Sequence, residues 1–439
     1  MRDIALTMLF VAVLPFAVRH AYAGVLLWTW ISIMNPHKLT WGFATHAPFA
    51  AVAAGVTLMS LVITKDRLKF KLTPPILLLV LFVVWMCITT ALAFNPAGSW
   101  VQLNKVLKIQ LMTLIAIAAI QSKKHIELFV WVNALSVAFF GIKGGIYTIS
   151  TGGGGRVWGP PGGFIEGNNE LGLALIMTIP LLVFLRGTVD RPWIRKAMMM
   201  AIVLCAVSAI GTQSRGAMLA IAAMGFVLWL RSRSKMLSGI VIVVLAIGLV
   251  AFMPESWTQR MGTIQTYEED GSAMGRINAW HMTTNVANDR LTGGGFAVYS
   301  RPLFAIYAPN PDIVRVAHSI YFSVLGEHGY IGLFLFLAIW VAALRMAADL
   351  RKRARGVAEL QWVHMLASMC QVSLVGYAVG GAFLSLAYFD LPYNVFVILV
   401  VLKRWMDEKR WEQDKEGVFP ISLWRKRAPH LVGQRVGGK

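Results

Sequence analysis

Long apolar runs separated by short polar clusters occupy most of the chain. A run of about 20 apolar residues is long enough to cross a bilayer as a helix. Lipid offers no partner to backbone N–H and C=O groups, so we expect helices in these runs and no strands. The better-defined spans are expected at roughly Pro48–Thr64, Pro75–Phe94, Val106–Ile120, Ile126–Ile149, Leu171–Leu185, Met198–Gly211, Ala217–Leu230, Ile240–Phe252, Ile320–Leu344, His364–Leu386 and Tyr393–Leu402.

The first part of the chain resembles a signal peptide. Met1 and Arg2 precede an apolar stretch from Ile4 to Val18, and Ala21-Tyr22-Ala23 has the form of a cleavage site. Because further apolar segments follow at once, we expect an uncleaved first span. One or two spans are expected before Pro48, for a total of about twelve or thirteen.

Basic clusters fall at alternate ends of the predicted spans, which is the pattern of the positive-inside rule. The opposite face then holds three connections, at Asn95–Leu103, Thr151–Glu170 and Met253–Ala317. The chain divides into an N-terminal bundle (1–197), a core with the long loop (198–347), C-terminal helices (348–402) and a basic cytoplasmic tail (403–439). The clusters comprise Lys65, Arg67, Lys69 and Lys71; Lys123 and Lys124; Arg186, Arg191, Arg195 and Lys196; Arg231, Arg233 and Lys235; and Arg345, Arg351, Lys352, Arg353 and Arg355.

Composition supports a membrane protein. The 439 residues are 57% hydrophobic and only 14% charged, against about 25% charged in soluble proteins. The net charge of +20 lies in separate short clusters rather than on one surface, which argues against nucleic-acid binding. Cys87, Cys205 and Cys370 lie inside apolar runs without metal-ligand spacing, so we expect buried apolar cysteines, with no zinc site and no disulfide framework.

The long connection contains arginine but no lysine. A guanidinium group matches phosphate with a planar fork of donors, whereas lysine offers a point charge. A phosphate or pyrophosphate site is one interpretation, and pairing with nearby acidic residues is the other. The arginines are Arg260, Arg276, Arg290, Arg301 and Arg315, and the acidic residues include Glu268, Glu269, Asp270 and Asp289.

Two arginine motifs are candidates for anion binding. Arg215 in Gln-Ser-Arg-Gly lies at the outer end of a span, where it is either an interface anchor or bound to an anion. Arg276 and Trp280 lie in Gly-Arg-Ile-Asn-Ala-Trp, which we expect to open a helix toward Arg290. Fourteen residues of straight helix separate Arg276 from Arg290 by about 21 Å, so both cannot bind one pyrophosphate unless the helix breaks.

A histidine stands where the long loop returns to the membrane. His318 begins the motif His-Ser-Ile-Tyr, which also contains Tyr321. Imidazole is the usual general base at neutral pH, although a hydrogen-bonded interfacial histidine is the alternative. A buried Glu327–His328 pair deeper in the same helix is interpreted as structural. Further substrate-binding candidates are Arg315, Arg156 and Asn169 in the outer loops and Lys143 near the outer end of a span; Asn169 and Glu170 are also typical helix caps.

Several catalytic signatures are absent from the sequence. There is no phosphate-binding Walker motif, no Gly-x-Ser-x-Gly and no His-Glu-x-x-His. The outer loops contain acidic residues but no clustered carboxylate motif for a divalent cation. We therefore expect a reaction without metal or cofactor.

In combination and order, these motifs resemble the O-antigen ligase and O-antigen polymerase superfamily. The motifs are Gln-Ser-Arg-Gly at a span end, Arg-x-x-x-Trp in the long loop, the glycines at 293–295, His-Ser-x-Tyr, and Glu-x-Gly-Tyr-Ile-Gly-Leu. The resemblance is strongest from Met198 to Ala347. The N-terminal third resembles exosortase-associated O-glycosylation ligases. Ser319 stands where Asn is frequent and Leu291 where Pro is frequent, which leaves the local loop geometry open.

The resemblance implies an all-α polytopic membrane glycosyltransferase of the GT-C-like kind in the bacterial inner membrane. The donor would be an undecaprenyl-pyrophosphate-linked glycan, and the acceptor a sugar hydroxyl of lipid A–core. Transfer would occur at the periplasmic face with inversion. Arg215 and Arg276 match the arginines expected to hold the pyrophosphate, and His318 matches the expected general base.

Three other functions stay open. A polymerase joins two lipid-linked glycans with the same donor chemistry, and a protein O-glycosylation enzyme uses an exported protein as acceptor. A transporter without chemistry is disfavoured, because no internal repeat is evident and the polar candidates lie at the outer boundary rather than at the bilayer midplane.

Overall fold

A computed structural model describes residues 1–412 apart from 64–69, 232–233, 237–238 and 241–270. Within these residues the chain forms α-helices and short 3-10 helices and no strand. In this described part of the chain, seven helices are long and apolar enough to cross a membrane, and three shorter helices are also apolar. The prediction of an all-α polytopic membrane protein is confirmed. The predicted span Ile240–Phe252 lies outside the described residues except for its first residue, so the total of about twelve stays a prediction.

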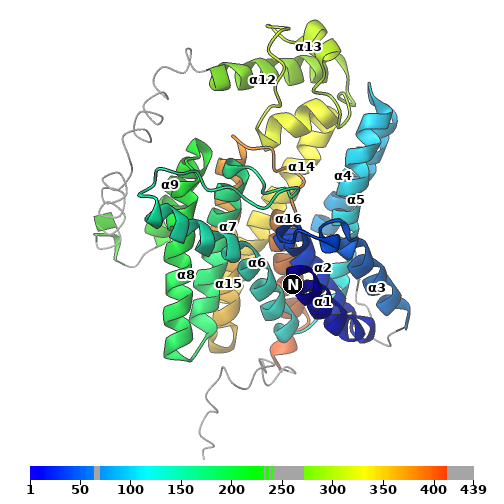
Figure 1. The fold of residues 1–439 in the computed structure, drawn as a ribbon. Helices are drawn as coiled ribbons and strands as arrows, with labels where there is room; N and C mark the ends of the chain where they lie inside the picture. Colours follow the sequence, from blue (N-terminus) through cyan, green and yellow to red (C-terminus); the bar gives the residue numbers. More distant parts are fainter. Residues whose placement is uncertain (64–69, 232–233, 237–238, 241–270, 413–439) are drawn as a thin grey trace, which may run out of the picture.

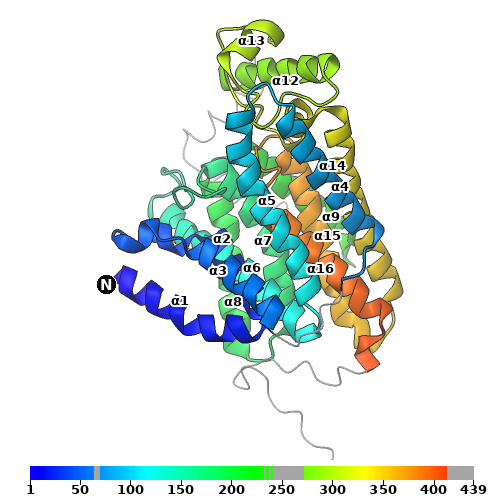
Figure 2. The same ribbon diagram turned by 90° about the vertical axis from the view of Figure 1, so that its right-hand side faces the viewer.

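The first 63 residues form three helices that pack together. They are α1 (Arg2–Arg19), α2 (Ala21–Met34) and α3 (Phe49–Ile63), with the 3-10 helices η1 (Pro36–Leu39) and η2 (Phe43–His46) between α2 and α3. Gly24 allows α2 and α3 to pack closely, because a Cβ there would lie 2.4 Å from Oγ1 of Thr57. Figure 2 shows these helices as a separate layer beside the main bundle.

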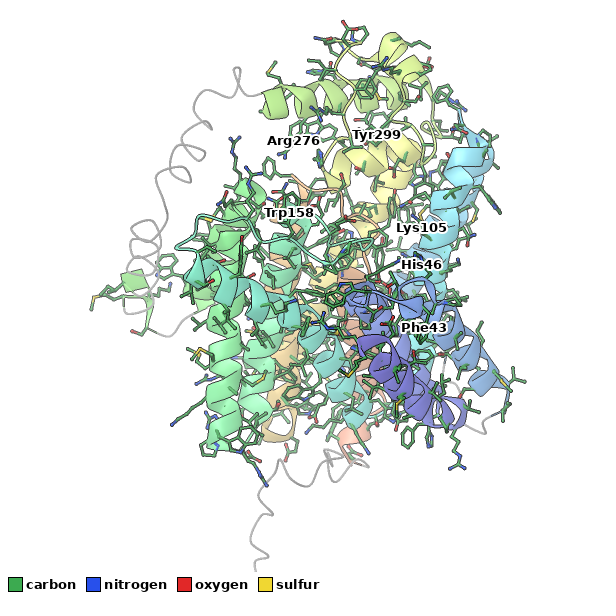
Figure 3. The ribbon with its side chains drawn as sticks, in the orientation of Figure 1. Phe43, His46, Lys105, Trp158, Arg276 and Tyr299 are labelled. Carbon is green, nitrogen blue, oxygen red and sulfur yellow. The ribbon has the colours of Figure 1, made fainter. Side chains whose placement is uncertain are left out.

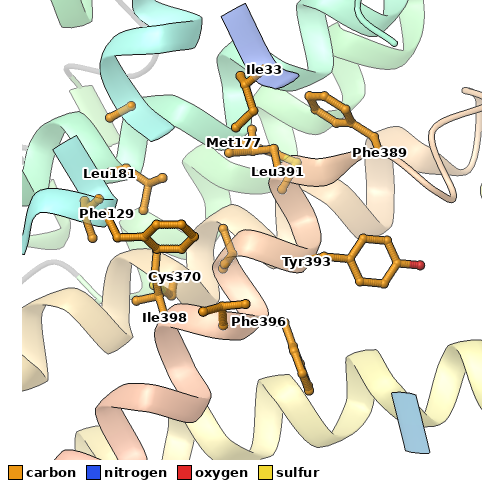
Figure 4. Packing of buried hydrophobic residues seen from close by; sticks show 14 of the residues in the cluster. Ile33, Phe129, Met177, Leu181, Cys370, Phe389, Leu391, Tyr393, Phe396 and Ile398 are labelled. Carbon is orange, nitrogen blue, oxygen red and sulfur yellow. The ribbon is translucent and has the colours of Figure 1, made fainter. Parts of the chain in front are cut away.

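The main bundle surrounds α16. Every residue from Asp390 to Leu402 is buried, and Figure 4 shows Tyr393, Phe396 and Ile398 among apolar side chains of neighbouring helices. Proline within the first two residues starts α4, α5 and α8, where its missing N–H costs no helical hydrogen bond. The helices are α4 (Pro74–Ala91), α5 (Pro96–Ala119), α6 (Lys123–Ser150), α7 (Asn168–Thr188), α8 (Pro192–Gly211), α9 (Arg215–Arg231), α14 (Ile320–Arg353), α15 (Gln361–Gly381) and α16 (Asp390–Asp407), with η3 (Ala358–Leu360) and η4 (Arg410–Glu412).

Several predicted boundaries are wrong: α8 begins at Pro192 rather than Met198, α14 ends at Arg353 rather than Leu344, and α16 ends at Asp407 rather than Leu402. Two further differences change where the connections lie. The segment Asn95–Leu103 was expected to be a connection, but α5 begins at Pro96 because Asn95 accepts a hydrogen bond from the Gly98 amide (3.0 Å). The span expected to end at Leu386 ends at Gly381. The following connection, 382–389, is largely buried and is held by tyrosine hydroxyls that donate to the carbonyls of Leu386 and Ala387.

Two helices cross one end of the bundle, which we call the loop end (Figure 1). They are α12 (Gly271–Asp289) and α13 (Arg301–Tyr307). The predicted helix at Arg276 is confirmed, although it begins before Gly275. The two helices share a small apolar core made of Ala279, Met282, Val286, Val298, Leu303 and Phe304.

A break in α14 attaches this layer to the bundle. Gly329 has φ 65° and ψ −169°, which interrupts the helical hydrogen bonds. The carbonyls of Gly326 and Glu327 accept instead from the amides of Gly294 (2.8 Å) and Gly295 (2.9 Å). A Cβ on Gly329 would lie 2.2 Å from the Leu291 carbonyl oxygen. Only glycine therefore permits both the conformation and the contact.

We expect Gly329→Ala to lower the free energy of unfolding by about 2 kcal/mol or more, from backbone strain and overpacking. Thermal unfolding in detergent and proteolysis of the α12–α13 layer measure the effect. Gly55→Ala is the matched control, because its Cβ would meet nothing within 4 Å and alanine favours helix by about 1 kcal/mol. Equal stability of the two variants would contradict the docking role of the break.

Candidate functional site

The long loop brings His318 beneath α12. His318 has φ 45° and precedes Ser319, the N-cap of α14. The indole N–H of Trp280 donates to the carbonyl of Ala317 (2.7 Å), and its ring stacks on Phe322 with centroids 4.8 Å apart. Trp280 thus fixes the backbone just before His318 from one side and the first turn of α14 from the other.

Arg276 and Arg315 lie on the same side of this layer. The side-chain amide of Asn278 donates through Nδ2 to the backbone carbonyls of Asn310 (2.8 Å) and Ile313 (3.0 Å). These bonds attach the segment before His318 to α12. A Cβ on Gly275 would lie 3.1 Å from Cγ of Arg315, so the Arg315 side chain packs against the turn that carries Arg276. Figure 3 shows Arg276 and the side chain of Tyr299 between α12 and the start of α14.

The two arginines act on His318 electrostatically. Burial, followed by the charges of Arg276 and Arg315, lowers the pKa of His318 to about 4. Its ordinary value is about 6.5, so the imidazole is neutral at pH 7 and able to accept a proton. A region with two guanidinium groups beside a neutral base is suited to an anion next to a reacting hydroxyl.

A second layer lies around Arg215, the first residue of α9. The Nδ2 of Asn168 donates to the carbonyl of Thr212 (2.8 Å). Arg156 donates through Nε to Gln213 (3.3 Å), whose own amide donates to the Gly153 carbonyl. The glycine-rich connection is therefore attached to the turn before Arg215. A guanidinium beside the positive end of a helix dipole is a further feature that favours an anion.

Glu170 connects the two layers. Its carboxylate folds back over the start of α7, where a Cβ on Gly167 would lie 2.0 Å from Oε2. It also interacts electrostatically with Arg276. Two residues earlier, Asn168 contacts the turn before Arg215. The start of α7 thus places Arg276 above the Arg215 layer.

We call the region between α12 and the Arg215 layer, which includes Arg276 and His318, the seam. Other candidates lie apart from this seam or make structural contacts. Arg290 donates to the Leu92 carbonyl (2.5 Å) and lies 4.1 Å from the Phe94 ring, so it contacts the α4–α5 connection. Lys143 lies over the Phe139 ring on its own helix, α6. Tyr321 donates to the Ala378 carbonyl (2.7 Å). Asn169 is half-buried in the first turn of α7.

Glu327 and His328 form a separate buried cluster at the α14 break. Glu327 accepts from the Tyr388 hydroxyl (2.5 Å), and Nδ1 of His328 lies 2.7 Å from the Thr89 hydroxyl. These contacts join α14 to α4 and to the 382–389 connection. They fit the structural interpretation of this pair.

Sequence reasoning missed two residues of the seam. Glu170 was interpreted as a helix cap, with binding of sugar hydroxyls as the alternative, and its electrostatic interaction with Arg276 was not predicted. Tyr299 was not singled out, because it follows the glycine run in a segment without periodicity. Its hydroxyl lies beside Ser323 and the Ala317 backbone. The sequence feature that could have pointed to Tyr299 is its place, as a polar aromatic residue, between the glycines at 293–295 and His318.

Comparison with known families divides the chain in two. Residues 200–337 match the family model described as O-antigen ligase. Residues 1–190 match a family of unknown function (DUF5935), so the N-terminal resemblance to exosortase-associated enzymes stays a prediction. Among curated proteins, none matches the chain. The ligase match covers Arg215, Arg276 and His318, and therefore most of the seam.

We expect the His318 imidazole to titrate near pH 4. Arg315→Gln removes one nearby positive charge, so the pKa of His318 should rise toward its ordinary value. NMR of ring-labelled histidine in nanodiscs measures the pKa of His318 in the unsubstituted protein and in Arg315→Gln. The His318 signal is assigned by its loss in His318→Gln. Arg301→Gln, an exposed position at the start of α13, should leave the titration unchanged. A His318 pKa near 6.5 in the unsubstituted protein would contradict the arrangement.

Proposed function

We propose that the chain is an O-antigen ligase, since residues 200–337 match the family model of that description. It transfers a glycan from undecaprenyl pyrophosphate to a sugar hydroxyl of lipid A–core, at the periplasmic face of the inner membrane. The observation that carries this proposal is the convergence of Arg276, Arg315 and His318 beneath α12. Family membership itself implies a lipid-linked glycan donor and a lipid acceptor.

The reaction forms one bond and breaks one. The acceptor hydroxyl oxygen attacks the anomeric carbon of the donor sugar, and the bond from that carbon to the pyrophosphate oxygen breaks. The electron pair leaves with undecaprenyl pyrophosphate, and the hydroxyl proton passes to His318. Attack opposite the leaving group inverts the anomeric centre. Arg276 and Arg215 hold the pyrophosphate, and their fixed charges stabilise the negative charge that develops on it.

The charge arrangement makes the base responsive to the reaction. In the free protein, Arg276 and Arg315 lower the pKa of His318. Negative charge on a pyrophosphate beside these arginines offsets their effect, so the pKa of His318 rises. The imidazole therefore becomes a stronger base when the donor is bound and as its leaving group develops charge. Interactions that strengthen toward the transition state accelerate the chemical step.

His318→Ala should reduce the rate of glycan transfer by about 10²–10⁴-fold, because base catalysis is lost. Arg276→Ala and Arg215→Ala should also reduce transfer, through weaker stabilisation of the leaving group. Purified protein, lipid-pyrophosphate glycan and lipid A–core, with a chelator present, form the assay. Arg301→Ala is the matched control and should retain full transfer. Full transfer by both His318→Ala and Arg276→Ala would refute the catalytic assignment.

The acceptor distinguishes a ligase from the related functions. With lipid A–core supplied, a ligase produces a ladder on lipopolysaccharide. A polymerase instead lengthens the lipid-linked glycan whether or not lipid A–core is present, and a protein O-glycosylation enzyme modifies only an added exported protein. We expect the product on lipid A–core. Longer lipid-linked glycans without any lipopolysaccharide product would favour the polymerase.

A further inference from the structure

Among the residues that the structure describes, three polar atoms on or beside the proposed base lack hydrogen-bond partners. They are Nδ1 of His318, Oγ of Ser319 and the hydroxyl of Tyr299. All three atoms are buried, and within the described part of the chain no contact of theirs meets hydrogen-bond geometry. Buried polar groups are ordinarily satisfied, and leaving one unsatisfied costs free energy. A cluster of such groups beside a reactive residue indicates a ligand that supplies the missing bonds.

Ser319 is an unusual N-cap. A serine at this position normally accepts a hydrogen bond from an amide of the first turn. Ser319 makes no such bond, although its side chain is only 1% exposed. Its hydroxyl is therefore available both to donate and to accept, at the residue that follows His318.

Tyr299 supplies the third polar atom of this cluster. Its hydroxyl lies beside the backbone of Ala317 and beside Ser323, and Ser323 is one helical turn below Ser319. The Tyr299 hydroxyl thus lies against the same turn that carries His318 and Ser319. Burial, reinforced by the charge of Glu327, raises the pKa of Tyr299, so the hydroxyl stays protonated and able to donate.

We propose that Tyr299 and Ser319 form the acceptor subsite, which binds the hydroxyl groups of a sugar. One sugar hydroxyl donates to His318 and is the attacking group. A neighbouring hydroxyl of the same sugar bonds Ser319 and Tyr299, which aligns the attacking oxygen. Hydroxyl side chains suit this ligand because each can donate to or accept from a sugar hydroxyl. This inference rests on the proposed function for the identity of the acceptor.

Kinetics of Tyr299→Phe and Ser319→Ala test the subsite. Each variant should lower kcat/KM for lipid A–core by about 5–100-fold, the loss expected for a buried hydrogen bond, while the KM for the donor stays within about twofold. Because the Ser319 hydroxyl makes no hydrogen bond and the Tyr299 hydroxyl has only poorly aligned contacts with Ser323 and Ala317, Tm should change little. Tyr307→Phe is the matched control: it removes a tyrosine hydroxyl that donates to Asp289 on α12, and its kinetics should be unchanged.

Different outcomes distinguish a failure of the acceptor subsite from a failure of the proposed function. If Arg276→Ala impairs transfer but kcat/KM for lipid A–core is unchanged in both hydroxyl variants, the subsite is wrong and the function stands. A lower Tm with equal effects on donor and acceptor would assign the hydroxyls a structural role and overturn the inference. If the unsubstituted protein transfers nothing, the proposed function fails. Titration of core oligosaccharide onto the purified protein then decides the subsite, which requires binding that Tyr299→Phe weakens.

Discussion

The arrangement of the loop end depends on the backbone contact between two glycine segments. Gly294 and Gly295 donate to carbonyls that α14 leaves unpaired when it breaks at Gly329. An unpaired carbonyl in a membrane protein is costly, and a broken helix is tolerated only where other protein groups satisfy it. The loop amides therefore satisfy the free carbonyls of the broken helix, and the same hydrogen bonds position the loop. The Phe94 amide also donates to the Gly294 carbonyl, which attaches α4 to the same contact.

The position of the proposed base follows from this contact. Between the docked glycines and Ile320, the chain forms α13 and returns along α12, where Asn278 and Trp280 hold it by hydrogen bonds to its backbone carbonyls. His318 thus stands on a segment fixed at both ends, with a backbone conformation that non-glycine residues rarely adopt. Rigid support of this kind is what a catalytic group needs, since small misplacements reduce rates strongly.

Hydropathy predicted the helices well because lipid restricts a spanning chain to one secondary structure. It failed where a polar segment is nevertheless helical, as at the start of α5, since the Asn95 cap and Pro96 rather than apolar residues set that boundary. The motif residues Arg276 and His318 were predicted to act together, and they do lie close enough to interact. The electrostatic interaction of Glu170 with Arg276 and the position of Tyr299 could not be predicted, because both depend on how α12 lies over the bundle. The break at Gly329 was also missed, since its sequence is compatible with a continuous apolar helix.

Two features of the seam are unfavourable for the folded protein. Like charges on Arg276 and Arg315 lie beside a buried imidazole, and within the described residues the buried hydroxyls of Ser319 and Tyr299 lack partners. The α12–α13 layer contributes only a small apolar core of its own, so this core alone is a weak source of compensation. The glycine contact at the α14 break, together with the bonds from Asn278 and Trp280, holds the layer in place without using the unsatisfied groups. Under the proposed function, a donor pyrophosphate would relieve the charge repulsion, and an acceptor sugar would satisfy the hydroxyls. The features that reduce the stability of the free site are therefore the ones that would favour binding of the proposed donor and acceptor.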